Sequence, residues 1–294
     1  MPLNLGVLMS RRVTALTQRY GHKDTILYAL AVGAGRPTTT GEDLKFVYED
    51  GLQALPTLAT VLACPRFWAS DSRAGIDSRY VLHSAQTLTM HRILAPKGIA
   101  SSETHVTGVY DKGPGRGAIV HTTRRLWDEY RNVVADIGTA IFIRNAGGFG
   151  GHRYPRVNVT VDNCGRSADE AAEIVVRPDQ SLIYRLTGDD NALHVDPQAA
   201  KAAGFDRPIL HGLCTYGIVG RAILELCCED KPQRLARLDT YFTSPVYPGE
   251  TLRVEVWRRS LTELAFRCLA LPRGVVVLDG GYAQLTSHKR GRSD

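Results

Sequence analysis

The chain has 294 residues, of which 44% are hydrophobic and 22% are charged, and its formal net charge is +6. This composition excludes disordered and fibrous proteins and is compatible with one large domain or two of about 150 residues each. The charge excess suits a phosphate-bearing ligand and equally suits an ordinary soluble surface. Because no run of five basic residues occurs, nucleic acid binding is not favoured.

The cysteines and the N-terminus bear on metal binding and on location. No C-x-x-C pair and no Cys/His cluster at zinc-ligand spacing occurs among the six cysteines. The N-terminal MPLNLGVLMSRR lacks both the charged region and the cleavage site of a secretory signal. No apolar run approaches the roughly 20 residues of a membrane helix. We therefore expect a cytoplasmic protein without a bound metal or a membrane anchor.

The first half of the chain reads as an opening loop, an apolar segment at 51–63 and a meander of strands. Apolar and polar residues alternate clearly in Thr104–Val109, which is typical of a half-buried strand. The expected strands are 81–93, 103–110, 118–127 and 133–144.

The second half repeats this order of elements, with a loop at 184–197, a helix at 212–228 and a second meander. The helix is apolar on nearly all faces, which predicts that it is buried. The expected strands are 237–242, 251–259, 263–271 and 275–286. The repeat predicts an α+β fold in which an antiparallel sheet wraps a central helix twice, with domains at 1–160 and 161–294.

A glycine-rich segment, Gly147–Gly151, lies between the two halves. Four glycines in five residues indicate either backbone freedom or a close approach to another group. A flexible linker is the alternative. A dinucleotide-binding fingerprint is excluded, because no strand and helix flank the segment at the required spacing.

Residues 184–204 form the most informative segment. Asp196 can cap a short helix, Pro197 suits its first position and Gly204 can end it. A loop anchored by a capped helix holds side chains still, as a reactive site requires.

Asp189, Asn191 and His194 lie in the loop that enters this short helix. Asp189 and His194 could share a water, one accepting its proton while the other donates a proton to a substrate, and each such transfer contributes about 10²- to 10⁴-fold in rate. Asn191 could orient the pair or the water. The alternative is structural, because Asp and Asn are common in loops and at caps.

Gly212 stands at the N-terminus of the predicted buried helix. The first N–H groups of a helix lack intrahelical partners and carry partial positive charge. An N–H there, with no side chain obstructing it, could polarise a thioester carbonyl toward an enolate. Simple close packing is the alternative for Gly212, and His211 is interpreted as a satisfied loop histidine.

The stretch Tyr184–Gly217 strongly resembles the MaoC-like, hydratase 2 family, which includes the hydratase 2 region of the peroxisomal multifunctional enzyme type 2. The resemblance implies a double hot-dog fold, with two antiparallel sheets each wrapping a central helix. It also implies that Asp189 and His194 are the catalytic dyad, that Asn191 is their neighbour in the catalytic motif, and that Gly212 is the oxyanion donor.

Other segments resemble the family more loosely. Val81–Gln86 resembles its H-G-E-Q segment, and Tyr110–Gly113 resembles its D-K-G turn. Gly147–Gly151 also matches a family segment. The resemblance implies substrate contacts for His83, Ser84, Lys112, Asp190, Ala192, Leu193 and Phe242.

Two positions depart from the family pattern. Ser84-Ala85 stands where the family has G-E, and Ala192 stands where it has proline. The first departure concerns the acyl preference, and the second loosens the loop only modestly.

The resulting hypothesis is an (R)-specific 2-enoyl-CoA hydratase that converts trans-2-enoyl-CoA into (R)-3-hydroxyacyl-CoA. No metal or redox cofactor is expected, because the thioester already acidifies C2 and polarises C3. The first half has no D-x-N-x-x-H motif, so one active site per chain is expected. The family resemblance implies a homodimer. The alternatives are a hot-dog thioesterase, a dehydratase acting on carrier-protein-bound 3-hydroxyacyl groups, and an acyl-CoA-binding subunit.

Overall fold

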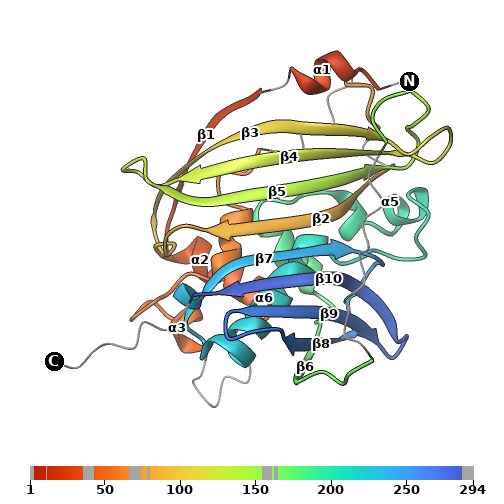
Figure 1. The fold of residues 1–294 in the computed structure, drawn as a ribbon. Coiled ribbons are helices and arrows are strands. Elements are labelled where there is room, and N and C mark those ends of the chain that lie inside the picture. The colour runs from red at the N-terminus through yellow and green to blue at the C-terminus, as the bar shows by residue number, and fades with distance from the viewer. Residues whose placement is uncertain are drawn as a thin grey trace.

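The computed structural model describes residues 3–10, 12–35, 43–65, 74–77, 80–153, 161 and 165–286. Within these ranges the strands form a single antiparallel sheet in the order β1-β3-β4-β5-β2-β7-β10-β9-β8-β6 (Figure 1). The strands are β1 (Arg12–Tyr20), β2 (Val81–Met90), β3 (Gly98–Asp111), β4 (Ala118–Trp127), β5 (Val133–Ile143), β6 (Glu170–Val175), β7 (Leu235–Phe242), β8 (Thr251–Arg258), β9 (Glu263–Leu271) and β10 (Val275–Leu285).

The two halves of the chain join through one pair of strands. β1–β5 come from the first half and β6–β10 from the second, and β2 pairs with β7 with Ala85 opposite Tyr241. The two expected sheets therefore merge edge to edge into one continuous sheet. The expected boundary between 160 and 161 adjoins residues 154–160, which lie outside the described residues.

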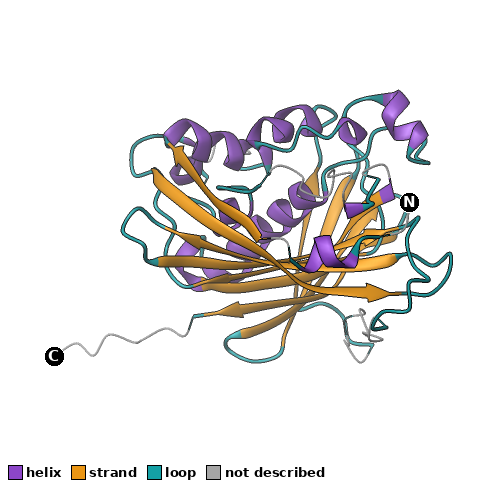
Figure 2. Cartoon of the chain, turned by 90° about the horizontal axis from the view of Figure 1, so that it is seen from above, coloured by secondary structure: helices purple, strands orange, loops and turns teal. Residues whose placement is uncertain are grey.

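Most of the helices gather on the concave side of the curved sheet (Figure 2). The described helices are α1 (Leu5–Met9), α2 (His22–Ala31), α3 (Leu44–Val47), η1 (Pro56–Thr60), α4 (Gln180–Tyr184), η5 (Arg185–Thr187), η6 (Ala192–His194), α5 (Pro197–Ala202), α6 (Gly212–Cys228) and η7 (Pro232–Arg234). The predicted buried helix is confirmed as α6, whose Tyr216 hydroxyl donates to the carbonyl of Leu238 on β7. None of these helices is long and apolar enough to cross a membrane.

The central helix that we expected in the first half is much shorter in the structure. Residues 51–63 form only η1, a short 3-10 helix that begins at Pro56. The buried guanidinium of Arg124 on β4 donates to the carbonyls of Ala59, Thr60 and Leu62 at 2.6–3.1 Å. The Arg124 guanidinium donates the hydrogen bonds that the N–H groups of a longer α-helix would otherwise supply to these carbonyls.

The prediction that the chain opens with a loop is wrong, because residues 12–31 form β1 and α2. The N–H of Gly21 donates to the Asp24 carboxylate at 2.8 Å, which stabilises the start of α2. β6 was also missed. It pairs with β8 as an edge strand, with Glu170 opposite Val256.

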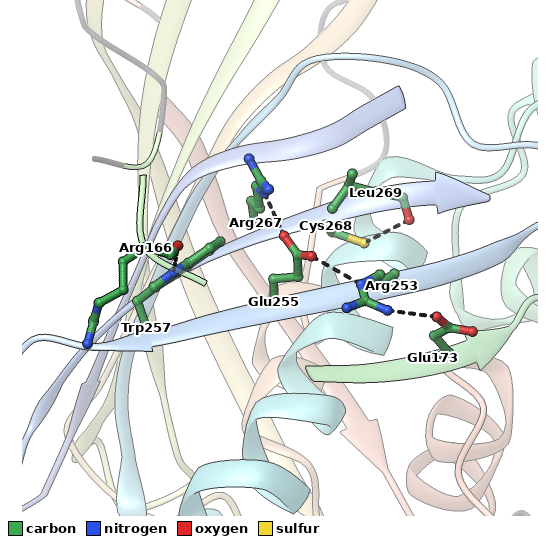
Figure 3. A network of polar contacts seen from close by, with 8 residues as sticks. All are labelled: Arg166, Glu173, Arg253, Glu255, Trp257, Arg267, Cys268 and Leu269. Carbon is green, nitrogen blue, oxygen red and sulfur yellow. Dashed lines mark hydrogen bonds and ion pairs between the residues drawn. The ribbon is translucent and has the colours of Figure 1, made fainter. Parts of the chain in front are cut away.

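A row of ion pairs links β6, at the edge of the sheet, to the neighbouring strands β8 and β9 (Figure 3). Arg253 on β8 donates to Glu173 on β6 at 3.0 Å and to Glu255 at 3.1 Å. Arg267 on β9 donates to the other Glu255 oxygen at 2.7 Å. The alternating charges connect three neighbouring strands without leaving a charge unpaired.

Candidate active site

The predicted capping of α5 is confirmed. The Asp196 carboxylate accepts the Gln198 N–H at 2.8 Å, Pro197 begins the helix, and Gly204 follows it with φ +86°. Asn191 caps η6, because its side-chain oxygen accepts the Leu193 N–H at 3.1 Å. Local hydrogen bonds therefore hold the loop from both sides, and the Asn191 oxygen positions the loop rather than a water.

His194 ends η6 and is buried, with 9% of its surface exposed. Its Nδ1 lies 2.9 Å from the carbonyl oxygen of Ile209. A carbonyl only accepts, so Nδ1 carries the hydrogen and Nε2 is left as a proton acceptor. Burial lowers the pKa of His194, while the charge of Asp189 acts in the opposite direction. His194 is therefore a neutral base at pH 7.

Asp189 lies beside His194 and is half-buried. The carboxylate of Asp189 and ring nitrogens of His194 and His211 lie within 4.8 Å of one another. Asp189 Oδ1 also accepts the Asn191 N–H at 3.3 Å. One carboxylate and one neutral imidazole at this separation can bind the same water, which is the arrangement that general base catalysis requires.

His211 belongs to this cluster, although it was interpreted as a satisfied loop histidine. Its ring stacks on His194 with centroids 3.8 Å apart, and its Nε2 donates to the Asp189 carbonyl at 3.2 Å. Burial, with a smaller contribution from His194, lowers the pKa of His211 to about 2. Among the described residues its buried Nδ1 has no hydrogen-bond partner. The signal that could have identified it is its place directly before Gly212.

We expect His211→Phe to lower kcat about 5-fold with little change in KM, because the loss of one hydrogen bond to a catalytic loop costs about 1 kcal/mol. Phenylalanine keeps the stack on His194 but cannot donate to the Asp189 carbonyl. Steady-state kinetics of the purified variant test this role. An unchanged kcat would show that the bond does not position Asp189.

Gly212 begins α6, and its N–H makes no hydrogen bond within the described part of the chain. A Cβ at this position would lie 3.2 Å from Cε1 of Phe242 and 3.6 Å from Cβ of His83. The rings of His83 and Phe242 lie 4.5 Å apart. Glycine thus leaves the helix N-terminus accessible between two aromatic rings, where a carbonyl oxygen could accept the N–H.

His83 and Ser84 lie at a β-bulge in β2. The register shifts between His83, opposite Ile141, and Ala85, opposite Ala140. Such bulges redirect side chains next to active sites. His83 Nε2 lies 3.1 Å from the carbonyl of Ala85, and burial lowers the pKa of His83 to about 4. His83 therefore faces Phe242 as a neutral ring.

The remaining predicted contacts lie on the catalytic loop and on the β3–β4 turn. Lys112 is exposed on the β3–β4 turn, with Nζ 5.1 Å from the ring centroid of Phe142. Asp190 and Ala192 are exposed and Leu193 is half-buried on the catalytic loop. The structure thus brings Asp189, His194, Gly212, His83 and Phe242 to one place and leaves Lys112 at another strand turn.

Asp189, His194 and His211 are also the residues that offer a metal ion three ligand atoms in the described part of the chain. Two of their imidazole nitrogens already form hydrogen bonds, to Ile209 and to the Asp189 backbone. The two rings stack nearly in parallel, 29° apart. This arrangement suits an acid-base pair better than converging ligands.

The fold and the site define a MaoC-type double hot-dog protein. Two family models match the chain, the MaoC like domain at residues 159–267 and the MFE-2 hydratase 2 N-terminal domain at 18–145. A MaoC-like dehydratase from Phytophthora capsici has a similar structure, with a TM-score of 0.83 and 30% identity, over 97% of this chain and 99% of that chain. A Mycobacterium tuberculosis protein described as a double hotdog fold superposes with a TM-score of 0.56 at 15% identity, over 94% of this chain and 95% of that chain.

Curated relatives give the same result at the level of sequence. The probable enoyl-CoA hydratase 2 of Dictyostelium discoideum is 35% identical over 99% of both chains. The 3-hydroxyacyl-thioester dehydratase Y of Mycobacterium tuberculosis is 41% identical over 83% of this chain and 84% of its own length. The chain belongs to the MaoC-like, enoyl-CoA hydratase 2 family.

Proposed function

We propose that this protein is an (R)-specific 2-enoyl-CoA hydratase that reversibly adds water to trans-2-enoyl-CoA. The observation that carries the proposal is the pair Asp189 and His194 beside the accessible N–H of Gly212. Relatives named enoyl-CoA hydratase 2 support the reaction and its substrate class.

In the proposed mechanism the thioester carbonyl accepts the Gly212 N–H at the start of α6. Water lies between Asp189 and His194 Nε2, which takes a proton as the water oxygen attacks C3. The Asp189 carboxylate stabilises the imidazolium that forms. The enolate then takes the proton from His194 at C2, so that the elements of one water are added and both residues return to their starting state. The (R) configuration comes from the family resemblance.

The decisive assay follows the loss of enoyl-thioester ultraviolet absorbance with crotonyl-CoA and trans-2-decenoyl-CoA, with chiral analysis of the product. We expect the (R)-3-hydroxyacyl-CoA and no release of free thiol. Thiol release in place of hydration would identify a thioesterase instead. Turnover only with a carrier-protein-bound 3-hydroxyacyl group would identify a dehydratase of that kind.

The pH dependence of kcat/KM tests the protonation state of His194. Burial lowers its pKa below the ordinary 6.5, so His194 remains an unprotonated base as the pH falls past that value. Because the pKa lies below 6.5, we expect kcat/KM at pH 6.5 to be more than half its value at pH 7.5 and to reach half only at lower pH. A half-maximal rate at pH 6.5 or above would contradict this protonation state.

We also propose that the enzyme needs no metal or redox cofactor, acts as a homodimer and is cytoplasmic. The acidity of C2 in a thioester and the Gly212 N–H supply the activation that a Lewis acid would otherwise provide. Full activity after dialysis against EDTA supports the first point, and sedimentation of the purified protein tests the second. Fractionation of the producing cells tests the location.

A further inference from the structure

A surface cavity of about 420 Å³ lies among residues that the proposed mechanism does not use. Its walls come from three segments: residues 206–207 before α6, residues 247–250 between β7 and β8, and residues 272–273 in the β9–β10 turn. We call it the Tyr247 cavity, because the Tyr247 ring contacts a cation from each of the other two segments. The guanidinium carbons of Arg207 and Arg273 lie 4.8 Å and 5.2 Å from the ring centroid. The volume is within the range of about 300–1,000 Å³ that is typical of small-molecule sites.

Glu250 fixes one of these two cations. Its carboxylate is buried and accepts hydrogen bonds from Arg273 Nε, from Arg273 Nη2 at 2.9 Å and from the Tyr247 N–H at 2.8 Å. Arg273 Nη2 also donates to the Pro245 carbonyl at 2.8 Å. In the described part of the chain Arg273 Nη1 makes no hydrogen bond. A guanidinium that is held in place thus keeps two N–H groups for a ligand.

Arg207 is the second cation, and it is exposed. It forms no hydrogen bond or ion pair with any residue that the structure describes. Burial would raise the pKa of Glu250, but the hydrogen bonds from Arg273 and Tyr247, with the charges of Arg273 and Arg207, lower it. Glu250 is therefore ionised at pH 7, and its oxygens are occupied by Arg273 and Tyr247. The exposed carboxylate of Asp206 lines the cavity without pairing with Arg207, which keeps its N–H groups for a ligand.

These unused donors indicate a tetrahedral oxyanion. The N–H pairs of a guanidinium match the oxygens of carboxylate and phosphate groups. Arg207 and Arg273 belong to separate segments, and both contact the Tyr247 ring. A planar carboxylate presents its two oxygens to one guanidinium, whereas a phosphate presents oxygens in several directions and can accept from both. The cavity therefore suits a phosphate group better than a carboxylate.

The cavity and the predicted substrate path lie on opposite sides of the active site. The strands β2, with His83, and β7, with Phe242, form the central pair of the sheet, which β5 and β4 continue in one direction and β10 and β9 in the other (Figure 1). The family resemblance implies that the thioester ligand reaches Lys112 on the β3–β4 turn. Four strand spacings of about 4.8 Å separate β4 from β10 by roughly 19 Å along the sheet. We therefore expect the ligand of the cavity to be distinct from the substrate.

The cavity shares one segment of chain with the catalytic site. Arg207 begins the run 207–211, in which the Ile209 carbonyl accepts the Nδ1 hydrogen of His194 at 2.9 Å. The Leu210 N–H donates to the Val246 carbonyl at 2.7 Å. An anion bound by the two arginines would tie this segment to the β9–β10 turn and so stabilise it.

We propose that the Tyr247 cavity binds a phosphate group that is not part of the substrate, with Arg207 and Arg273 as the binding residues, and that its occupancy stabilises the segment that holds His194. The proposal does not depend on the hydratase assignment, because neither arginine acts in the proposed mechanism.

Calorimetry with inorganic phosphate in a buffer of low ionic strength tests the site. We expect a Kd on the order of 1 mM for the wild type, because two charge-assisted contacts at the surface give a modest affinity. Acetate is expected to bind at least about 10-fold more weakly, because it can engage only one guanidinium. Absence of phosphate binding, or equally tight binding of acetate, would overturn the proposal.

Two variants and a matched control locate the binding. Arg207→Gln removes the unpaired guanidinium and should raise the Kd about 10-fold. Arg273→Lys leaves an ammonium for Glu250 but removes the Nη1 donors, and should raise the Kd about fivefold. The control is Arg92→Gln, which removes an exposed charge from the β2–β3 turn, at the opposite end of β2 from His83, and leaves the Kd unchanged. A Kd that is unchanged in either variant, or raised equally in the control, would overturn the site.

Competition and hydrogen exchange test the remaining parts of the proposal. Saturating coenzyme A should leave the Kd for phosphate unchanged, whereas a competitive increase would assign the cavity to the thioester ligand and overturn its independence from the substrate. Exchange of the Leu210 amide should slow at saturating phosphate in the wild type and stay constant in Arg207→Gln. Equal exchange with and without phosphate in the wild type would overturn the stabilisation of the segment that holds His194.

Discussion

Asp189→Asn is expected to lower kcat for trans-2-enoyl-CoA hydration by at least about 10²-fold while KM changes little. Asparagine keeps the size of the side chain and removes the negative charge that favours protonation of His194. The same ultraviolet assay at saturating substrate measures the loss. Because Asn191 and His211 bond to the loop around residue 189, a thermal melt of the variant should match the wild type.

The matched control for this variant is Asp206→Asn, which removes the same charge from an exposed position before α6. We expect its kcat to stay within about twofold of the wild type, because a screened surface charge contributes little at a distance. Similar losses in both variants would show that net charge, rather than the Asp189 and His194 pair, controls the rate.

Arg124→Met is expected to lower the free energy of unfolding by about 3 kcal/mol or more. The substitution leaves the carbonyls of Ala59, Thr60 and Leu62 buried without their donor, and each unsatisfied group costs about 1–3 kcal/mol. Methionine has a similar length and can fill the space. Urea unfolding followed by circular dichroism gives the value.

The neighbouring Arg125 is the control for this prediction. It faces solvent, and its guanidinium pairs with Asp136 at 2.7 Å. An exposed ion pair contributes about 0.2–1 kcal/mol, so Arg125→Met is expected to have a small effect. Equal destabilisation by the two substitutions would refute the role given to the Arg124 guanidinium.

The sequence by itself determined the elements whose signals are local. The range of α6 follows from apolar residues on all of its faces, and α5 follows from Asp196 and Pro197. Eight of the ten strands were located from alternation and turn residues. The reaction was indicated by the resemblance of residues 184–217 to the family, which lies within one stretch of chain.

Only the tertiary structure decided the features that depend on distant segments. Arg124 reaches carbonyls more than 60 residues away in sequence, and the alternation within β4 gives the face of Arg124 but not these partners. Asp111 bonds to Gly148 and Gly150 in the same way, which turns a glycine-rich stretch into a packed loop. His211 lies beside the dyad because the fold packs the start of α6 against the catalytic loop. Local sequence patterns indicate secondary structure, whereas the hydrogen-bond partners of buried polar groups can lie anywhere in the sequence and are fixed by the tertiary structure.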